Sequence, residues 1–290
     1  MKQWHDIMHK VLTTGVCRPD RTGVGTFALF GEQLRFNNIA DNFPAVTTKK
    51  LAFGQVAAEL ACFLNGYDNL ADFHKMGCNI WDGNGESDYW KPRMRLEGDL
   101  GRIYGVQWRD WLSVNTDSPS GFTSLDQLKV LVNGLLTDPY GRRHLVTAWN
   151  PGELDKMCLP PCHVLFQCFV RRTISCPLRA YKPYTLDLRV DMRSVDLFLG
   201  LPFDVASYAL LQQLIANEVN MRAGDLIFQL GDAHIYLNHQ EQVRSVLAKE
   251  PKKAPILVLR DDSGLFRFDN KTPFLVDYEH HGAVPAPLNI

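Results

Sequence analysis

The segment 159–163 places a cysteine and a histidine directly after two prolines. Pro160 and Pro161 restrict the backbone before Cys162, and His163 follows it. A cysteine reacts as its thiolate, and positive charge nearby lowers the pKa of a thiol and increases the thiolate fraction. Because several arginines of the chain can gather near it, Cys162 is the predicted nucleophile. The residues alone leave one alternative open, a buried cysteine that precedes a strand.

Two later segments carry side chains suited to an anion and to a heterocyclic base. Residues 193–196 read Arg-Ser-Val-Asp, and residues 200–208 read Gly-Leu-Pro-Phe-Asp-Val-Ala-Ser-Tyr. A nucleotide monophosphate needs about two countercharges, and arginine supplies bidentate donors to phosphate oxygens. The carboxyl of Asp204 is a candidate for reading a base. An aspartate that caps a helix beginning at Val205 is the alternative, and both roles can coexist.

Cys158, Cys162 and His163 together form a Cys-x3-Cys-His cluster, which is compatible with a metal or redox centre. The cluster lacks a second ligand pair at zinc-like spacing, and both prolines lie between the two cysteines. We therefore predict no metal site.

Composition limits the class of protein. The 290 residues are 46% hydrophobic, enough for a full core, and we expect one domain over residues 1–290. The net charge of -1, from 31 basic and 32 acidic residues, does not suggest a surface for duplex nucleic acid or an anionic membrane. No leader or membrane span is apparent, and seven cysteines without a disulfide-scaffold spacing suit a reducing cytoplasm.

Helical and strand patterns alternate along the chain, which predicts an α/β fold. We expect helices over residues 54–64, closed by Gly66, after a capping box at Ser124–Gln127, and over residues 205–222, ended by Gly224. Strands are predicted at residues 144–149, 164–170, 185–192 and 226–230. The third strand alternates between apolar and charged residues, so one face should pack and the other should carry charge. Residues 86–100 are expected to form a surface loop.

Ordered motifs along nearly the whole chain resemble those of the thymidylate synthase family. Besides the segments above, they are residues 20–26 (Asp-Arg-Thr-Gly-Val-Gly-Thr), 43–50 (Phe-Pro-Ala-Val-Thr-Thr-Lys-Lys), 80–82 (Ile-Trp-Asp), 104–109 (Tyr-Gly-Val-Gln-Trp-Arg), 138–143 (Asp-Pro-Tyr-Gly-Arg-Arg), 231–236 (Gly-Asp-Ala-His-Ile-Tyr) and 286–290 (Ala-Pro-Leu-Asn-Ile). The resemblance implies an α+β fold with a large mixed sheet packed with helices, in a homodimer that joins sheet to sheet. It also implies that residues 83–100 are a surface insertion and that residues 284–290 are a C-terminal lid.

The resemblance assigns catalytic roles. In this family the cysteine, here Cys162, adds to C6 of a pyrimidine nucleotide and makes C5 a nucleophile toward 5,10-methylenetetrahydrofolate. Glu59 would organise water and proton transfer around the base, although a buried structural glutamate is an alternative. Tyr104 would assist removal of the C5 proton, and His163 and Asp204 complete the catalytic set.

Nucleotide binding is assigned in the same way. Arg21, Arg193 and Ser194 would hold the phosphate, and Arg142 and Arg143 would reach it from the partner subunit. His234 and Tyr236 would bond the sugar 3′-hydroxyl, and Asp196 would also contact the nucleotide. The alternatives are a solvated arginine pair and hydrogen-bonded core residues.

Folate binding is assigned to two sets of side chains. Lys49 and Lys50 would lie near the glutamyl tail, and the wall around the ring would be Ile80, Trp81, Asp196, Leu199, Gly200 and Phe203. A surface lysine pair and a core tryptophan are the alternatives.

Asp204 stands where thymidylate synthases carry an asparagine that reads uracil. Cytosine presents an amino donor at position 4 and an acceptor at N3, which a carboxyl can complement, so we predict dCMP rather than dUMP as substrate. A mispaired buried group costs roughly 1–3 kcal/mol.

Two further departures from the thymidylate synthase pattern favour water, rather than hydride, as the group that reacts with the one-carbon unit on C5. Asn84 replaces a second tryptophan after Trp81, and Met192 replaces a glutamine before Arg193, so the site resembles deoxycytidylate hydroxymethylases of DNA-modifying phages. We therefore expect 5-hydroxymethyl-dCMP as product, in a cytoplasm that could be that of a phage-infected host. The alternatives are a methyl-forming enzyme on dCMP, a thymidylate synthase on dUMP, and a non-catalytic nucleotide- or metal-binding protein. The C-terminal lid argues against water, as would Trp90 if it replaced the missing ring.

Overall fold

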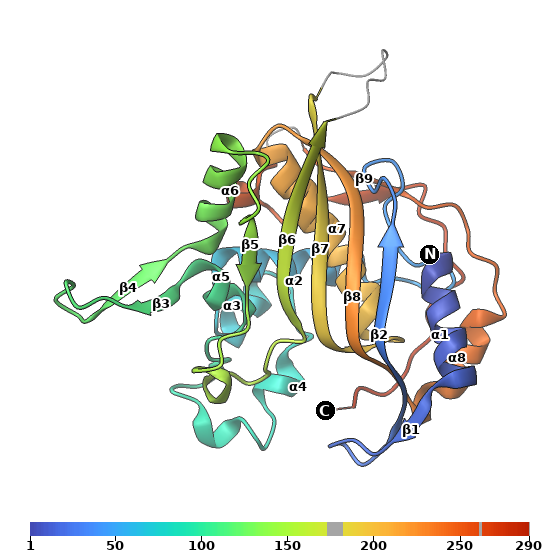
Figure 1. The fold of residues 1–290 in the computed structure, drawn as a ribbon. Coiled ribbons are helices and arrows are strands. Elements are labelled where there is room, and N and C mark those ends of the chain that lie inside the picture. Colours follow the sequence, from blue (N-terminus) through green and yellow to red (C-terminus); the bar gives the residue numbers. More distant parts are fainter. Residues whose placement is uncertain (173–181, 261–262, 290) are drawn as a thin grey trace.

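The computed structural model describes residues 1–172, 182–260 and 263–289. A six-stranded sheet forms its centre, in the order β1-β2-β8-β7-β6-β5 (Figure 1). These strands are β1 (Val16–Arg18), β2 (Thr26–Phe36), β5 (Leu145–Thr147), β6 (His163–Arg172), β7 (Tyr184–Asp196) and β8 (Arg222–Tyr236). The pair β7 and β8 is parallel and the other pairs are antiparallel, which confirms the expected mixed sheet.

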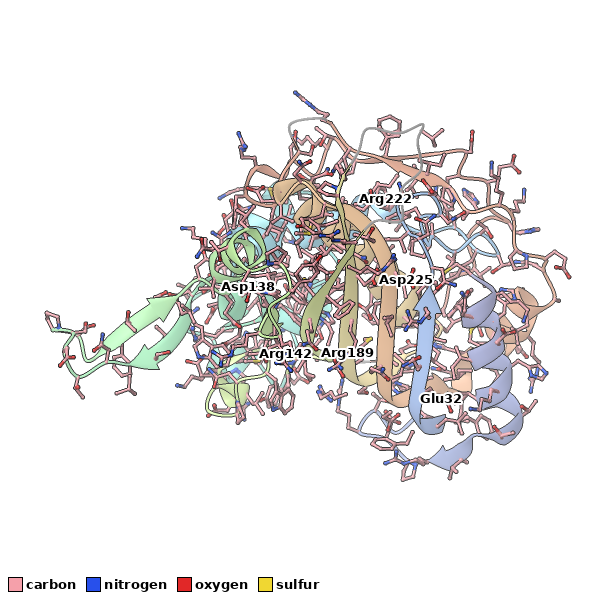
Figure 2. All side chains as sticks on the ribbon, turned by 45° about the horizontal axis from the view of Figure 1, so that its top comes forward. Glu32, Asp138, Arg142, Arg189, Arg222 and Asp225 are labelled. Atoms are coloured by element: carbon pink, nitrogen blue, oxygen red, sulfur yellow. The ribbon has the colours of Figure 1, made fainter. Side chains whose placement is uncertain are left out.

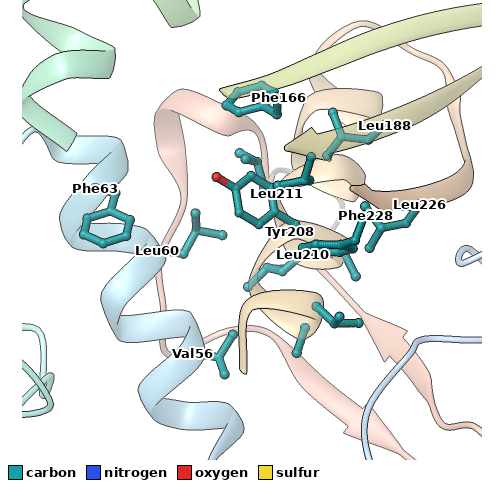
Figure 3. Packing of buried hydrophobic residues seen from close by; sticks show 14 of the residues in the cluster. Val56, Leu60, Phe63, Phe166, Leu188, Tyr208, Leu210, Leu211, Leu226 and Phe228 are labelled. Carbon is teal, nitrogen blue, oxygen red and sulfur yellow. The ribbon is translucent and has the colours of Figure 1, made fainter. Parts of the chain in front are cut away.

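Helices cover one face of this sheet. In Figure 1, α7 (Gly200–Glu218) and α2 (Phe53–Asn65) lie behind the strands, and α1 (Lys2–Thr14) and α8 (Gln240–Leu247) lie beside β2. Figure 3 shows Tyr208 and Leu211 of α7 among Phe166 and Phe228 of the sheet, with Leu60 of α2 opposite. In the described part of the chain no helix or strand covers the near face, where Figure 2 shows charged side chains.

The remaining elements are short. They are α3 (Leu70–Lys75), α4 (Asp82–Gly85), α5 (Tyr104–Arg109), α6 (Gln127–Thr137), the hairpin β3 (Trp111–Val114) and β4 (Phe122–Leu125), the pair β9 (Ile256–Val258) and β10 (Phe274–Val276), and the 3-10 turns Lys91–Arg93, Leu154–Lys156, Leu237–His239 and Leu265–Arg267. No described helix is long and apolar enough to cross a bilayer.

Strand β7 confirms the expected alternation. Its apolar positions Leu186, Leu188 and Val190 are fully buried against the helices. On the other face Arg189 is exposed and donates to Asp191 at 2.8 Å. Both β7 and β8 run beyond the predicted strands into polar sequence, because the parallel pairing of the two continues through Ser194 and Asp196.

Two predicted helix starts are wrong. Asp126, not Ser124, caps α6, since its carboxylate accepts the backbone N–H of Lys129 at 3.1 Å, and Ser124 lies in β4. Helix α7 begins at Gly200, so Asp204 lies inside the helix and is not its N-cap. The carboxylate of Asp196 instead organises this turn by accepting the N–H groups of Phe198 and Leu199.

The two predicted glycine stops differ in outcome. Gly66 closes α2 in a left-handed conformation with φ 69°, as expected. Helix α7 ends at Glu218, and Gly224 lies within β8 instead. A Cβ at Gly224 would come 2.0 Å from the carboxylate of Asp187, so glycine is required there by close packing.

The stretch 83–100 is only partly a surface loop. Most of its side chains are exposed, but Trp90 is 2% exposed and its indole N–H donates to the carbonyl of Asp99 at 2.5 Å. Asp99 is itself buried and accepts from the guanidinium of Arg95. These contacts hold the loop together internally, and it is joined to the body by the ion pair of Arg95 with Asp68 at 2.7 Å and by the backbone N–H of Leu70, which donates to the carbonyl of Gly98 at 2.8 Å.

Candidate active site

Chain direction brings the predicted site residues together at one end of the central strands β6, β7 and β8. Strand β6 begins at His163, directly after Cys162, and is antiparallel to β7, so its start meets the end of β7. Strand β8 runs parallel to β7 and pairs His234 with Asp196. Cys162, the segment 193–196 and the segment 234–236 therefore converge.

Arg193 is held beside Cys162 by the backbone of the two prolines. Its guanidinium donates to the carbonyls of Pro161 at 2.8 Å and Pro160 at 2.9 Å, and its backbone N–H donates to the carbonyl of Cys162 at 2.8 Å. The Pro-Pro segment thus fixes the cation as well as the thiol.

The thiol of Cys162 has a raised pKa, which differs from the sequence expectation. Burial has the largest effect and raises the pKa, as does the charge of Asp204. Arg193, a hydrogen bond from Tyr104 and Arg21 lower it, but they do not outweigh burial. In the free protein Cys162 is therefore a protonated thiol at neutral pH.

Tyr104 joins the nucleophile to its surroundings. Its hydroxyl accepts the backbone N–H of Cys162 at 2.7 Å, and its ring stacks on His163 at 4.0 Å. Burial raises the pKa of the Tyr104 phenol well above its usual value, so the group keeps its proton. Tyr104 lies at the start of α5, whose residues are nearly all buried.

Glu59 lies on α2 as a buried carboxyl with one indole partner. Trp81 Nε1 donates to its Oε1 at 2.7 Å. Burial raises the pKa of Glu59 to about 7, and the Trp81 hydrogen bond acts in the opposite direction. A carboxyl with that pKa exchanges a proton near neutral pH, as an acid–base group requires.

Asp204 and His163 form a second titratable pair. Burial raises the pKa of Asp204 well above its usual value, and the charges of Glu59 and Asp196 add to this effect. Burial lowers the pKa of His163 to about 3. Both shifts favour the uncharged form of the side chain, and His163 Nε2 lies 3.9 Å from Asp204 Oδ1. A neutral carboxyl in this position offers both a donor and an acceptor.

The residues expected to bind phosphate and sugar surround this centre. Arg21 is exposed in a loop that Asp20 organises by accepting the N–H groups of Thr22 and Gly25. His234 Nδ1 lies 3.1 Å from Asp232 Oδ1. The expected sugar partner Tyr236 contacts the ring of His234, and Ser194 follows Arg193 on β7.

Arg142 and Arg143 lie apart from this centre, in the turn between α6 and β5. Both are exposed, and among the described residues neither has an ion-pair partner. Figure 2 places Arg142 beside the open face of the sheet. This subunit alone does not bring them to Cys162.

The expected folate wall is only partly brought together. Trp81 is buried and bonded to Glu59, while Ile80 is 36% exposed, and Leu199, Gly200 and Phe203 are half-buried at the start of α7. Asp196 uses Oδ1 for backbone N–H groups, which leaves Oδ2 for a ligand. Two aromatic rings, two aliphatic side chains and one carboxylate oxygen fit a flat ring that carries hydrogen-bonding groups.

The two lysines differ from each other. Lys49 is buried, and its ammonium donates to the carbonyl of Phe198 at 2.6 Å. Burial lowers the pKa of Lys49 to about 8. Lys50 is exposed, so of the two only Lys50 presents its charge to an anionic tail at the surface.

The C-terminal segment docks next to the end of β8. His239 Nε2 lies 2.8 Å from the carbonyl of Pro287, and Asn289 exchanges amide hydrogen bonds with Asn238. Ile290, the last residue of the expected lid, lies outside the described residues, as does Cys176.

Sequence reasoning missed two buried residues of this region, His239 and Tyr208. His239 contacts the tail, and Tyr208 bonds His163. Tyr208 stands four residues after Asp204, a helical spacing that places both on one side of α7 and was the available signal. Among the described residues no group of three or more His, Cys, Asp or Glu is arranged to hold a metal ion.

Comparison with known proteins identifies the family. The family model described as thymidylate synthase matches residues 2–290. The chain belongs to the thymidylate synthase family. Proteins named thymidylate synthase from three strains of Coxiella burnetii are each 41% identical over 291 aligned positions, which cover 100% of both chains.

Membership confirms part of what the sequence predicted. The chain is a folate-dependent enzyme that transfers a one-carbon group to C5 of a pyrimidine nucleotide, with 5,10-methylenetetrahydrofolate as donor. The names of these relatives point to dUMP, not to dCMP, as the nucleotide on which such proteins act.

Proposed function

We propose that this enzyme acts on dCMP and leaves 5-hydroxymethyl-dCMP. The observation that carries the proposal is the buried carboxyl of Asp204, whose pKa is raised well above its usual value beside neutral His163. A protonated carboxyl at this position matches the hydrogen-bonding edge of cytosine.

The match depends on where one proton lies. Against cytosine, the carboxyl donates to N3 and its other oxygen accepts from the amino group at position 4. Against uracil, the protonated oxygen of the carboxyl would donate to O4, and the other carboxyl oxygen would accept from N3–H. O4 of uracil is a much weaker base than N3 of cytosine. Both bases can be bound with one proton, but the bond to N3 is the stronger. The enzyme should therefore prefer dCMP to dUMP.

The catalytic roles rest on the geometry around Cys162. Cys162 adds to C6, and its thiol proton must leave as the bond forms, since the free thiol is protonated. Glu59, with a pKa of about 7, exchanges protons with the base through water. Tyr104 positions Cys162 and, since its phenol keeps its own proton, assists removal of the C5 proton by holding a water molecule that accepts it. The one-carbon unit comes from 5,10-methylenetetrahydrofolate.

Nucleotide binding is proposed for residues near the same end of the central strands. Arg21, Arg193 and Ser194 hold the phosphate, and His234 and Tyr236 hold the 3′-hydroxyl of the sugar. Asp196 contacts the nucleotide and the folate ring, and the other folate contacts are Lys50, Ile80, Trp81, Leu199, Gly200 and Phe203.

A homodimer completes this site. The uncovered sheet face carries exposed Phe169 (66%) and Leu145 (40%), and Arg142 and Arg143 are exposed at its margin. A second copy packed on this face would bury the apolar groups and bring the two arginines toward the partner's phosphate site. Sedimentation of the purified protein should give twice the 32.9 kDa chain mass.

Hydroxymethyl rather than methyl product is proposed from access of water. Asn84, on α4, is half-buried and polar, which leaves room for water where an indole would exclude it. Trp90 is turned into the body with its N–H bonded to Asp99, so its ring does not replace the missing one. The docked C-terminal tail favours methyl formation, which is the second candidate outcome.

A thymidylate synthase on dUMP is the other candidate, favoured by the names of relatives at 41% identity. The deciding experiment incubates the enzyme with 5,10-methylenetetrahydrofolate and either dCMP or dUMP, and reads nucleotide mass and dihydrofolate absorbance. A hydroxymethyl mass on dCMP without dihydrofolate supports the proposal, and methylated dUMP with dihydrofolate contradicts it.

Two variants sharpen this assay. Asp204→Asn should shift preference from dCMP toward dUMP, whereas Asp155→Asn, an exposed aspartate outside the site, should leave it unchanged. Cys162→Ser should abolish turnover and keep nucleotide binding. Full activity of Cys162→Ser would overturn the covalent mechanism.

A further inference from the structure

Tyr208 contacts His163 from inside the core. Its hydroxyl oxygen lies 2.6 Å from His163 Nδ1, and both side chains are buried, at 3% and 8% exposure. Figure 3 shows the Tyr208 ring between Leu60 of α2 and Phe166 of the sheet. The hydrogen bond of the Tyr208 hydroxyl within the described residues is therefore to His163.

The hydrogen bond fixes which nitrogen of His163 carries the proton. Burial raises the pKa of Tyr208 well above its usual value, so its hydroxyl keeps its proton. The burial that lowers the pKa of His163 leaves that ring with one N–H. If Tyr208 donates to Nδ1, both its own proton and the Nδ1 lone pair are satisfied, and the imidazole proton lies on Nε2. The reverse arrangement would leave the phenolic proton buried without a partner among the described residues.

The consequence falls on Asp204. His163 Nε2 lies 3.9 Å from Asp204 Oδ1, which is beyond hydrogen-bond distance, so an N–H there acts through its partial positive charge and favours Oδ1 as the unprotonated oxygen of the neutral carboxyl. The carboxyl proton is then placed on Oδ2, the oxygen that donates to a base.

We propose that Tyr208 is a positioning residue for base recognition, which holds His163 with its proton on Nε2 and so determines how Asp204 presents its carboxyl. The inference rests on the proposed function of Asp204 as the base-reading group. Tyr208 is not a catalytic residue, since it acts only through His163.

The first test is spectroscopic and needs no substrate. With 15N-labelled histidine, a His163 ring protonated on Nε2 gives distinct nitrogen resonances for its two positions, assigned by their loss in His163→Gln. Tyr208→Phe keeps the ring packing against Phe166 and Trp108 and removes only the hydroxyl. We expect Nε2–H in the wild-type protein and a mixture of tautomers in Tyr208→Phe. A wild-type ring protonated on Nδ1 overturns the proposal, whether or not the variant folds.

The second test measures selectivity. Tyr208→Phe should lower the ratio of kcat/KM for dCMP to that for dUMP by about tenfold, the order expected for one buried hydrogen bond. In an Asp204→Asn background the same change should leave the ratio unaltered, because the carboxyl on which Tyr208 acts is absent. Tyr278→Phe is the matched control, since it removes a half-buried hydroxyl that donates to the carbonyl of Val46.

The outcomes separate this inference from the proposed function. If Asp204→Asn shifts the ratio and Tyr208→Phe does not, Tyr208 has no part in base recognition and the inference fails. If Asp204→Asn leaves the ratio unchanged, Asp204 does not read the base, and both the proposed substrate choice and the selectivity claim fail. If Tyr208→Phe changes the ratio equally in the wild type and in Asp204→Asn, the proposal that Tyr208 acts through Asp204 is also overturned.

Discussion

The indole nitrogen of Trp81 donates a 2.7 Å hydrogen bond to the carboxyl of Glu59, a residue whose pKa burial raises to about 7. The bond stabilises the charged form, so it holds this pKa lower than burial alone would. We predict that kcat/KM changes with an apparent pKa near 7 and that Trp81→Phe moves this transition upward by about one pH unit.

A control separates this effect from loss of the folate wall. Phe198→Leu changes another buried ring and should alter rates without moving the transition. A Trp81→Phe profile that overlies the wild type would show that Glu59 is not the titrating group.

Stability should depend on pH through Glu59. Its pKa is about 7 in the folded protein and 4.5 as a free side chain, so between these values the folded state holds a proton that the unfolded state releases. The unfolding free energy therefore falls as pH rises from about 4.5 to 7, by roughly 3 kcal/mol. Glu59→Gln should remove this loss, and denaturant titrations of both proteins at pH 5 and pH 8 measure it. Equal pH dependence of the two would contradict the prediction.

Alkylation of Cys162 should report the charge of Arg193. Because the thiol pKa is raised in the free enzyme, iodoacetamide should react more slowly at pH 7.5 than with free cysteine. Arg193→Gln removes the largest effect that lowers this pKa and should slow alkylation about threefold further. Arg189→Gln, on the same strand and outward-facing, is the control and should have no effect. Faster alkylation in Arg193→Gln would reverse the electrostatic argument.

Local patterns predicted much of the fold. The alternation in β7 and the glycine after α2 were recognised because each depends on neighbours a few residues apart. The start of α7 was missed because it depends on Asp196, whose carboxylate caps the turn from the end of a strand. Trp90 looked exposed among charged residues, yet its burial depends on Asp99.

The sequence predicted which residues form the site, but it did not predict the pKa values of their side chains. Motifs identified Cys162, Glu59 and Asp204, since residue type and order carry that information. The raised pKa of Cys162 was not predicted, because burial depends on how α5, β6 and α7 pack, which no short segment encodes. The spacing of Tyr208 from Asp204 placed both on one side of α7, but the contact of Tyr208 with His163 depends on tertiary packing.

Access of water should depend on Asn84. Restoring a large ring with Asn84→Trp should lower the fraction of hydroxymethyl product and raise the methyl product with its dihydrofolate, because the indole excludes water from the C5 carbon. Trp90→Phe is the contrasting variant. It loses the hydrogen bond to Asp99, so unfolding free energy should fall by about 1 kcal/mol while the product ratio stays constant. An altered ratio in Trp90→Phe would place its ring near the reaction.

Docking of the C-terminal tail should depend on His239. This ring is fully buried, its Nε2 lies 2.8 Å from the carbonyl of Pro287, and within the described residues its Nδ1 has no hydrogen-bond partner. Since a carbonyl only accepts, Nε2 carries the proton. Asp196 Oδ2 lies 4.0 Å from Nδ1, so one ring stands between the tail and the carboxylate that serves the folate site.

His239→Leu should therefore release the tail while keeping the apolar contact with Phe198. We expect carboxypeptidase to remove the last residues about ten times faster than in the wild-type protein, the order for one lost buried hydrogen bond. His281 is exposed, and its ring bonds the carbonyl of Glu250. His281→Leu is therefore the control and should leave the rate of digestion unchanged. Equal digestion of His239→Leu and wild type would mean that Asn238 and Asn289 hold the tail without the histidine.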